Sequence, residues 1–390
     1  MNRVTVDLEA LRQNLETIGD WMRAHGATWS VVTKVLCGHA ETLEALQILG
    51  VRSIADSRLR NLRAIERIIP SFESWYLRPP HPSIIPEVVE LADVSLNSEI
   101  RIIERLNEEA ARLDKIHRIV IMIELGDLRE GILPGSLVDF YQKVFELPNI
   151  TVLGIGANLG CLAGAVPDID QYMQLVLYRE LLELKFGRQL QLISAGSSVV
   201  LPLVLKNELP KSINHFRIGE SLFLGSDLVG GGTLPGLRND VILLEAEIAE
   251  IKEKSLVPTT ETAGIQPFEM NGDSQHKPGD RGYRALVTVG QLETAVEGLT
   301  PVREDYRIAG ASSDITVVNL GDNPEGLHVG DTIAFRVDYA ALLGLMNSPY
   351  VDKRVVPPLQ DLRDAGPRDP GAGVDPVFSD LDGDGTERGE

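Results

Sequence analysis

The sequence predicts an α/β protein, a (β/α)8 TIM-type barrel followed by a C-terminal all-β domain. Eight strand-like runs, each followed by a helix-like segment, fall between residues 29 and 218, and such alternation implies a parallel sheet. After residue 240 long helical patterns stop, and the alternating polar and apolar residues at 245–251 predict a half-buried strand. The runner-up is a doubly wound open sheet, but no glycine-rich turn follows the first strand.

The expected elements follow in chain order. An amphipathic helix is expected at residues 7–22, where apolar residues recur along one side. Barrel strands are expected at 29–33, 51–55, 75–77, 94–96, 118–124, 152–157, 190–193 and 216–218. Helices between them include 41–49, 58–69, 99–113 and 172–184. Strands of the second domain are expected at 241–251, 285–289, 306–311, 315–320 and 332–337.

These elements divide the chain into three parts. Residues 1–239 form the barrel, with a first strand that is free to join the second domain, and residues 240–355 form the β domain with a long loop at 259–282. Residues 356–390 contain nine acidic residues and only three arginines, among many Gly and Pro. This composition predicts a disordered, solubilising tail.

Composition excludes several classes of protein. A formal net charge of −20 argues against nucleic-acid binding, which needs a basic face. No apolar stretch is long enough to cross a bilayer and no secretory signal opens the chain, so a cytoplasmic protein is expected. The two cysteines, Cys37 and Cys161, exclude a four-cysteine zinc site. Residues 380–385 have the spacing that opens a calcium loop but lack its closing glutamate, so no metal is expected.

Lys34 follows the first barrel strand directly, ahead of the Gly38-His39 pair. An amine at the end of a buried strand loses part of its hydration, which favours a role as a nucleophile. The alternative is a lysine whose stem lies along the strand end while its amine reaches water.

Polar side chains also follow the other barrel strands, and barrel enzymes build their sites at this end. The residues are Lys34, Arg78, Asn97, Arg129, Asn158, Ser194, Ser197, Ser198, Arg217, Gly219 and Glu220. Three arginines and a lysine on one rim of an acidic protein predict an anionic small ligand. The serine-rich turn at 194–198 is suited to a phosphate, although either Ser197 or Ser198 taken alone is more typical of a helix N-cap. A lysine nucleophile beside a phosphate site suggests pyridoxal 5′-phosphate as cofactor.

Seven segments, in this order, carry a resemblance to a known family: residues 6–15, 32–34, 125–131, 194–198, 217–221, 310–314 and 348–351. The chain resembles the fold-type III pyridoxal-phosphate family of alanine racemase, and most of all its ornithine racemase branch. The resemblance spans both domains and leaves out the tail. It implies a homodimer whose two active sites are shared between subunits.

The resemblance also implies roles for individual residues. Lys34 would bond to the cofactor and act as one acid/base, and Arg129 would contact the cofactor's phenolic oxygen and the substrate carboxylate. Ser198, beside Ser197, would hold the phosphate together with the amides of Gly219 and Glu220. Arg217 matches the arginine that faces the pyridine nitrogen, and a guanidinium keeps its proton, so that nitrogen would stay largely unprotonated. The alternative for Arg217 is an ion pair at the barrel mouth.

Some positions depart from the family pattern. Gln291 stands where alanine racemases have a tyrosine acid/base from the partner subunit, and Asn158 stands in place of a histidine that stacks on the cofactor. Met122 replaces a lysine, and Cys37 a phosphate-contacting tyrosine. The second acid/base is therefore open among His39, Cys161, Asp314 and the loop 259–282, and Asp314, acting across the dimer interface, is taken into the catalytic set.

The sequence thus predicts a racemase for a basic or mid-sized amino acid such as ornithine, lysine or alanine. Three alternatives remain open. A non-catalytic cofactor carrier would lack the second domain, and a fold-type III decarboxylase would carry a glycine-rich phosphate loop and a cysteine in the β domain. The third is a family member that binds ligand without turnover, which the missing tyrosine allows.

Overall fold

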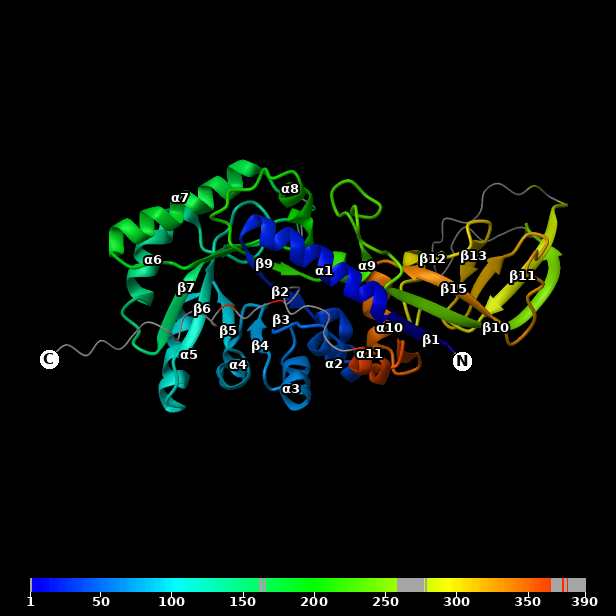
Figure 1. Ribbon diagram of the computed structural model, residues 1–390, viewed down its shortest axis with the longest axis horizontal. Coiled ribbons are helices and arrows are strands. Elements are labelled where there is room, and N and C mark those ends of the chain that lie inside the picture. The colour runs from blue at the N-terminus through cyan, green and yellow to red at the C-terminus, as the bar shows by residue number, and fades with distance from the viewer. Residues whose placement is uncertain are drawn as a thin grey trace.

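The computed structural model describes residues 2–160, 164, 166–257, 277, 279–365, 374 and 377. Its barrel and its β domain lie side by side along the long axis of the molecule (Figure 1). The predicted fold class is confirmed, because eight parallel strands close into a barrel and a largely antiparallel sheet follows. Cys161, most of the loop 259–282 and the segment 380–385 lie outside the described residues.

The barrel strands pair in chain order, β2 to β9, and β9 closes on β2. Their bounds are β2 Thr28–Val32, β3 Ser53–Asp56, β4 Glu73–Tyr76, β5 Val94–Asn97, β6 His117–Met122, β7 Ile150–Ala157, β8 Leu192–Ala195 and β9 His215–Ile218. The strands are short and buried on both faces, as parallel strands covered by helices are. All carboxyl ends therefore meet at one rim.

The helices have these bounds: α1 Leu8–His25, α2 Ala40–Ile48, α3 Leu59–Ile68, α4 Ile85–Leu91, α5 Ile100–Arg112, α6 Leu137–Val144, α7 Ile169–Phe186, α8 Leu201–Leu205, α9 Glu220–Leu224, α10 Tyr339–Asn347 and α11 Leu359–Ala365. Helix α1 begins where the Asp7 carboxylate accepts the Ala10 amide at 2.8 Å. It ends at Gly26, whose φ of 81° is left-handed. Helix α11 lies within the predicted disordered tail, so order continues at least to Ala365.

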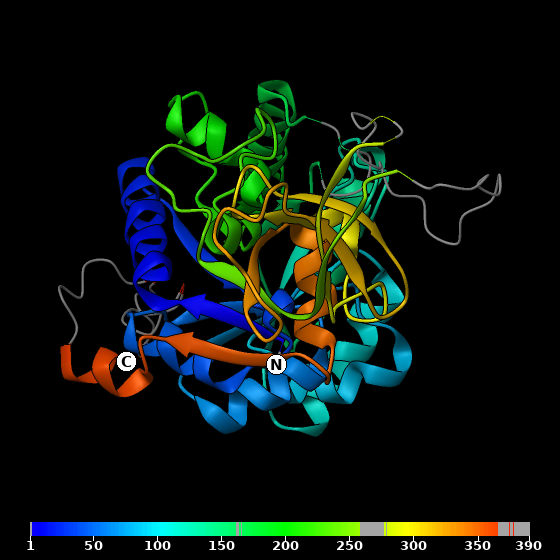
Figure 2. The same cartoon turned by 90° about the vertical axis from the view of Figure 1, so that its right-hand side faces the viewer.

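The β domain is one sheet in the order β12-β15-β10-β11-β14-β13. The bounds are β10 Ile242–Ser255, β11 Arg281–Val287, β12 Leu299–Pro301, β13 Arg307–Ala311, β14 Thr316–Asn319, β15 Thr332–Val337 and β16 Asp352–Val356. The first strand of the chain, β1 (Arg3–Asp7), pairs with β10 and runs parallel to β16 (Figure 2). The start and the end of the folded chain are thus joined in this sheet.

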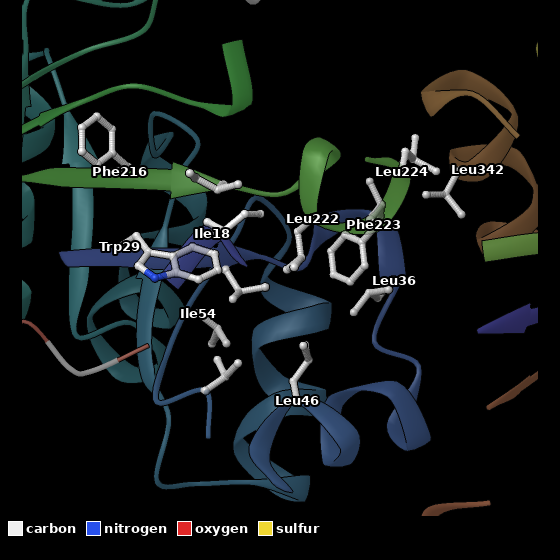
Figure 3. Close-up of a cluster of buried hydrophobic side chains, with 14 of the residues drawn as sticks. Ile18, Trp29, Leu36, Leu46, Ile54, Phe216, Leu222, Phe223, Leu224 and Leu342 are labelled. Atoms are coloured by element: carbon white, nitrogen blue, oxygen red, sulfur yellow. The ribbon is translucent and has the colours of Figure 1, made fainter. Parts of the chain in front are cut away.

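One core lies beneath the turn that carries Lys34. Leu36 lies beside Phe223 of α9, and Leu224 lies beside Leu342 of α10 (Figure 3). All four side chains are buried in the same apolar cluster. Burying a side chain of this size contributes about 1.5–3 kcal/mol. The packing fixes the Lys34 turn against a helix of the β domain, so both domains shape the barrel rim.

We expect the protein to lose stability as the pH falls from about 6.5 to about 4. Burial, with a smaller effect of the charges of Lys115 and Arg118, lowers the pKa of His117 to about 4. In the unfolded chain this histidine binds a proton at pH values at which it stays neutral in the folded protein. The contribution of His117 to the free energy of unfolding is therefore complete above the unfolded pKa of about 6.5 and is lost as the pH falls towards 4.

This histidine alone should lower the free energy of unfolding by about 2 kcal/mol between pH 6.5 and pH 5. Urea denaturation at a series of pH values, followed by tryptophan fluorescence, measures that slope. The slope should flatten in His117→Gln and persist in the control His328→Gln, whose side chain is exposed. An unchanged slope in His117→Gln would contradict the assignment.

Candidate active site

A cavity of about 510 Å³ opens at the carboxyl end of the barrel strands. Eight of the nine predicted site residues line it: Lys34, Arg129, Asn158, Ser197, Ser198, Arg217, Gly219 and Glu220. Apolar side chains, among them Val32, Leu77 and Leu96, form part of its wall. The strand ends that the sequence pointed to are therefore brought together. Asp314 is exposed in the turn between β13 and β14 and does not line the cavity within this subunit.

Lys34 is half-buried at the start of a short 3-10 helix, Lys34–Leu36, directly after β2. The chain turns back at Cys37, whose φ of 50° is left-handed and whose amide bonds to the Lys34 carbonyl. This tight turn lifts the lysine stem out of the strand and into the cavity. Its Nζ lies 5.6 Å from the centre of the Tyr339 ring, the first residue of α10.

Arg217 is 4% exposed and reaches the cavity floor from β9. One terminal nitrogen donates to the carbonyl and the hydroxyl of Ser194. The other donates to the Ala157 carbonyl at 3.0 Å and to Asn158 Oδ1 at 2.7 Å. Four hydrogen bonds from the two terminal nitrogens hold the guanidinium in one plane, and none of them involves a carboxylate. Both interpretations of Arg217, as the arginine that faces a cofactor and as part of an ion pair at the barrel mouth, stay predictions.

Glu130 links two of the three arginines that line the cavity, Arg129 and Arg217. Its carboxylate accepts two hydrogen bonds from Arg129, through Nε and through Nη2 at 2.7 Å, and a third from Asn158 Nδ2. Because Asn158 accepts from Arg217, Glu130 is connected to both guanidinium groups. The backbone amide of Arg129 is held separately by Glu124, at 2.9 Å. Glu130 thus fixes where the Arg129 side chain points.

The serine turn and the Gly219 turn lie together. The Ser198 hydroxyl accepts the Ser221 amide at 3.0 Å across the two turns. Ser197 takes the N-cap position of a 3-10 helix, but its side chain makes no capping bond there. A Cβ on Gly219 would lie 2.9 Å from the carbonyl oxygen of Val32, so only glycine lets this turn approach the first strand.

Glu220 adds a carboxylate to the cavity wall. Burial raises the pKa of Glu220, and the nearby Lys34 amine lowers it while Asp338 raises it again. The sequence interpretation used only the Glu220 amide, as part of the phosphate site. Its side chain is a second feature of the wall, close enough to Lys34 for their charges to interact.

Glu130 and Tyr339 are among the cavity residues that sequence reasoning missed. Glu130 stands next to Arg129 in the chain, but its pairing with Asn158 depends on strand neighbours. Tyr339 comes from the β domain and reaches the barrel rim only because α10 packs on the Lys34 turn. The one local signal for Tyr339 is the Asp338 N-cap, whose carboxylate accepts the Ala341 amide at 2.8 Å.

The candidates for a second acid/base fall in different places. His39 lies outside the cavity, where its Nδ1 lies 2.8 Å from the Thr42 hydroxyl. Asp314 lies beside the segment that replaces the family tyrosine, because the Gln291 amide donates to the Ser312 carbonyl and the Leu292 amide to Ser313. Cys161 lies outside the described residues. Asp314 therefore stays a prediction, in a turn that is bonded to the segment of Gln291, the residue that stands where the family has its tyrosine.

The donor set fits pyridoxal 5′-phosphate. The cavity offers one amine, three guanidinium groups (Arg78, Arg129 and Arg217), three serine hydroxyls and apolar walls, which suit an anionic, aromatic aldehyde. Its volume lies in the range of about 300–1,000 Å³ that small-molecule pockets have. The tight Gly219 turn beside Ser198 leaves backbone amides near the serine hydroxyls, which is the arrangement a phosphate needs.

The first barrel strand ends on a lysine that faces arginine and serine side chains in a cavity, and a helix of the β domain helps to close that cavity. This arrangement defines the class of fold-type III amino-acid enzymes. Comparison with known proteins narrows this class. The model of the alanine racemase N-terminal domain matches residues 6–227. An ornithine racemase from Acetoanaerobium sticklandii is 34% identical over 91% of this chain and 99% of its own length.

A lysine racemase from Thermotoga maritima is 30% identical over 90% of this chain and 97% of its own length. The alanine racemase of Bartonella henselae, solved with covalently bound pyridoxal phosphate, superposes with a TM-score of 0.67 at 13% identity. That likeness covers 91% of this chain and 99% of the other, and shows the fold. The chain belongs to the alanine racemase family and is an amino-acid racemase. Within the described residues, no helix is both long and apolar enough to span a membrane.

Replacing Glu130 by Gln should raise KM for the amino-acid substrate about tenfold, the effect of losing one charge-assisted hydrogen bond. The Arg129 guanidinium would lose the carboxylate that holds both its Nε and its Nη2, and it would sample more orientations. Steady-state kinetics give kcat and KM separately. The control Glu245→Gln removes the carboxylate bound by Arg3 in the β domain and should leave KM unchanged. An equal rise of KM in both variants would contradict a local role.

Proposed function

We propose that this racemase binds pyridoxal 5′-phosphate through Lys34 and interconverts the L and D forms of a basic or mid-sized amino acid. The observation that carries the proposal is that Lys34, Arg217, Ser197 and Ser198 all open on one cavity. The bound cofactor supplies an electron sink for the pair of electrons left when Cα loses its proton. The protein's part is to bind, to orient and to move that proton.

The roles of the cavity residues follow from their contacts. Ser198, with the amides of the Gly219–Glu220 turn, would hold the phosphate. Arg217, fixed by its four hydrogen bonds, would face the pyridine nitrogen without protonating it, because a guanidinium does not release its proton. Arg129, oriented by Glu130, would take the substrate carboxylate. Lys34 Nζ would remove or return the Cα proton on one face.

Racemisation needs a second proton donor on the opposite face, and we place it on the partner subunit's Asp314. Two exposed leucines support a dimer that covers this region. Leu128 is 78% exposed beside Arg129 at the cavity rim, and Leu292 is 72% exposed beside Gln291. Contact between these two segments in a dimer would cover both apolar side chains. We therefore propose a homodimer with shared sites.

The substrate is proposed from the relatives and from the cavity. The ornithine racemase and the lysine racemase reported above are, by their names, racemases of basic amino acids. The cavity wall carries two carboxylates, Glu130 and Glu220, and Glu130 is already paired with Arg129. Glu220 is the carboxylate left to face a distal ammonium group. Ornithine and lysine are therefore the first substrates to test, with alanine as the small reference.

The test is exchange at Cα. The purified protein, loaded with pyridoxal phosphate, is incubated in heavy water with single enantiomers of ornithine, lysine and alanine. Deuterium at Cα together with mirror-image product is expected for at least one of them. Label without mirror-image product would indicate one-sided exchange. A protein that binds the cofactor but labels nothing would favour a carrier or a family member without turnover, and release of carbon dioxide would favour a decarboxylase.

A further inference from the structure

A line of hydrogen bonds leaves the cavity through the interior of the barrel. It starts at Arg217, whose terminal nitrogen donates to the Ser194 hydroxyl. The same hydroxyl lies 2.7 Å from Nδ1 of His215, the first residue of β9. All three side chains are buried, and His215 is fully enclosed. The cavity arginine is thus connected to a histidine that no substrate can reach.

The line continues to the opposite end of the barrel. His215 Nε2 lies 3.2 Å from the Ser30 hydroxyl, which lies 2.8 Å from the Ser53 hydroxyl. Ser53 donates to the Glu73 carboxylate at 3.0 Å. Ser53 and Glu73 are the first residues of β3 and β4, so the line ends at the amino ends of the strands, away from the cavity.

The two ends fix the direction of every bond between them. An arginine can only donate and an ionised carboxylate can only accept. Because Ser53 gives its one proton to Glu73, Ser30 must give its proton to Ser53 and accept from His215. The histidine therefore carries a proton on Nε2. Because burial keeps the imidazole neutral, Nδ1 carries no proton, so Ser194 donates to Nδ1 while it accepts from Arg217.

The surroundings of His215 agree with this protonation state. Its ring stacks on Trp75 with the ring centres 4.4 Å apart, and Trp75 Nε1 donates to the same Glu73 oxygen at 2.8 Å. Burial and the charge of Arg217 hold the pKa of His215 well below its ordinary value. The imidazole is therefore held by hydrogen bonds at its edges and by an indole on its face.

We infer that Ser30, His215 and Glu73 are positioning residues for Arg217, acting through the Nε2–H tautomer of His215. With the proton on Nδ1 instead, the histidine would donate to Ser194, whose oxygen would then have to accept from the imidazole and from Arg217 at once. The Ser194 proton would lose its acceptor on His215, and the hydroxyl would hold the Arg217 guanidinium less firmly. The tautomer of a remote histidine thus decides whether Arg217 keeps the geometry that the cofactor meets. Only the link to the cofactor rests on the proposed function; the tautomer does not.

The experiment measures the tautomer of His215 and the dissociation constant for pyridoxal phosphate. Nitrogen-15 NMR of histidine-labelled protein, prepared without cofactor, gives the tautomer of His215, which is assigned by its absence in His215→Gln. Wild type should show Nε2–H. In Ser30→Ala the Nε2–H loses its acceptor, so the Nδ1–H form should appear and the dissociation constant for pyridoxal phosphate should rise about tenfold. In Glu73→Gln the amide oxygen can still accept from Ser53, so the Nε2–H form should persist.

The barrel offers a matched control. Ser95 is a buried strand serine whose hydroxyl lies 2.8 Å from Nε2 of His117, outside the line to Arg217. Ser95→Ala should leave the tautomer of His215 and the affinity for pyridoxal phosphate unchanged. Ser53→Ala cuts the line one step further on and replaces Ser30→Ala if that variant does not fold. An Nδ1–H histidine in wild type, or equal affinity losses in Ser30→Ala and Ser95→Ala, would overturn the inference. Wild type that shows Nε2–H but binds no pyridoxal phosphate would refute the proposed function and leave the direction of the line intact.

Discussion

Lys34→Ala should lose racemase activity by a factor of about 10³ or more, because in the proposed function this one substitution removes both the nucleophile and an acid/base. The visible absorbance of bound pyridoxal phosphate should disappear with it. Lys34 is the lysine that lines the cavity, and the tight turn at Cys37 aims its stem there. Loss of the amine does not disturb the core below it, since Leu36 and Phe223 keep their packing. The melting temperature should therefore change little.

Lys353 supplies the control for this prediction. It is the lysine for which burial lowers the pKa, it bonds to the Ser348 carbonyl, and it lies near Cys37 rather than in the cavity. A partly buried amine of this kind is the natural rival for bonding to an aldehyde. Lys353→Ala should keep both the absorbance and the activity. Persistence of the absorbance in Lys34→Ala and its loss in Lys353→Ala would move the attachment site and remove the basis of the proposed mechanism.

The barrel was predictable because its strands are short apolar runs that are buried on both faces, and the eight expected runs all fall on observed strands. The first and last residues of the strands were less predictable than the existence of the strands. The run at 190–193 becomes β8 at Leu192–Ala195, since Leu190 already packs in the core before the strand begins. Helix α10 was not expected, although its apolar run packs on the Lys34 turn, because that contact joins two domains and no local pattern shows it.

The site was predictable as far as strand ends determine it. The carboxyl ends of barrel strands meet at one rim whatever the loops do, so Lys34, Asn158 and Arg217 could be grouped from sequence. Glu130 could not be, since its function depends on which side chains its carboxylate meets. The hydrogen bonds from Ser194 to Glu73 were equally out of reach, because serine and histidine inside apolar runs acquire partners only when neighbouring strands align.

Asp314→Asn should slow racemisation by about 10²-fold or more while leaving the cofactor bound, because an amide cannot take up or release a proton in this range. The carboxylate is exposed in the free subunit, and its turn is fixed to the Gly290–Glu293 turn by backbone bonds. A Cβ on Gly290 would lie 2.4 Å from the Ser313 carbonyl oxygen, so this contact allows only glycine. Asp322→Asn, in the exposed turn after β14, is the control and should keep full activity.

Mixing two inactive variants tests whether Asp314 acts across the dimer. When Lys34→Ala and Asp314→Asn subunits exchange at equal amounts, half of the dimers pair one of each. In such a dimer one site receives Lys34 and Asp314 from different subunits and is intact, while the other lacks both. The mixture should therefore recover about a quarter of the wild-type activity. If Asp314 served its own subunit's cavity, no site in the mixed dimer would be complete and the activity would stay at the level of the variants. That outcome would contradict a proton donor shared across the dimer interface.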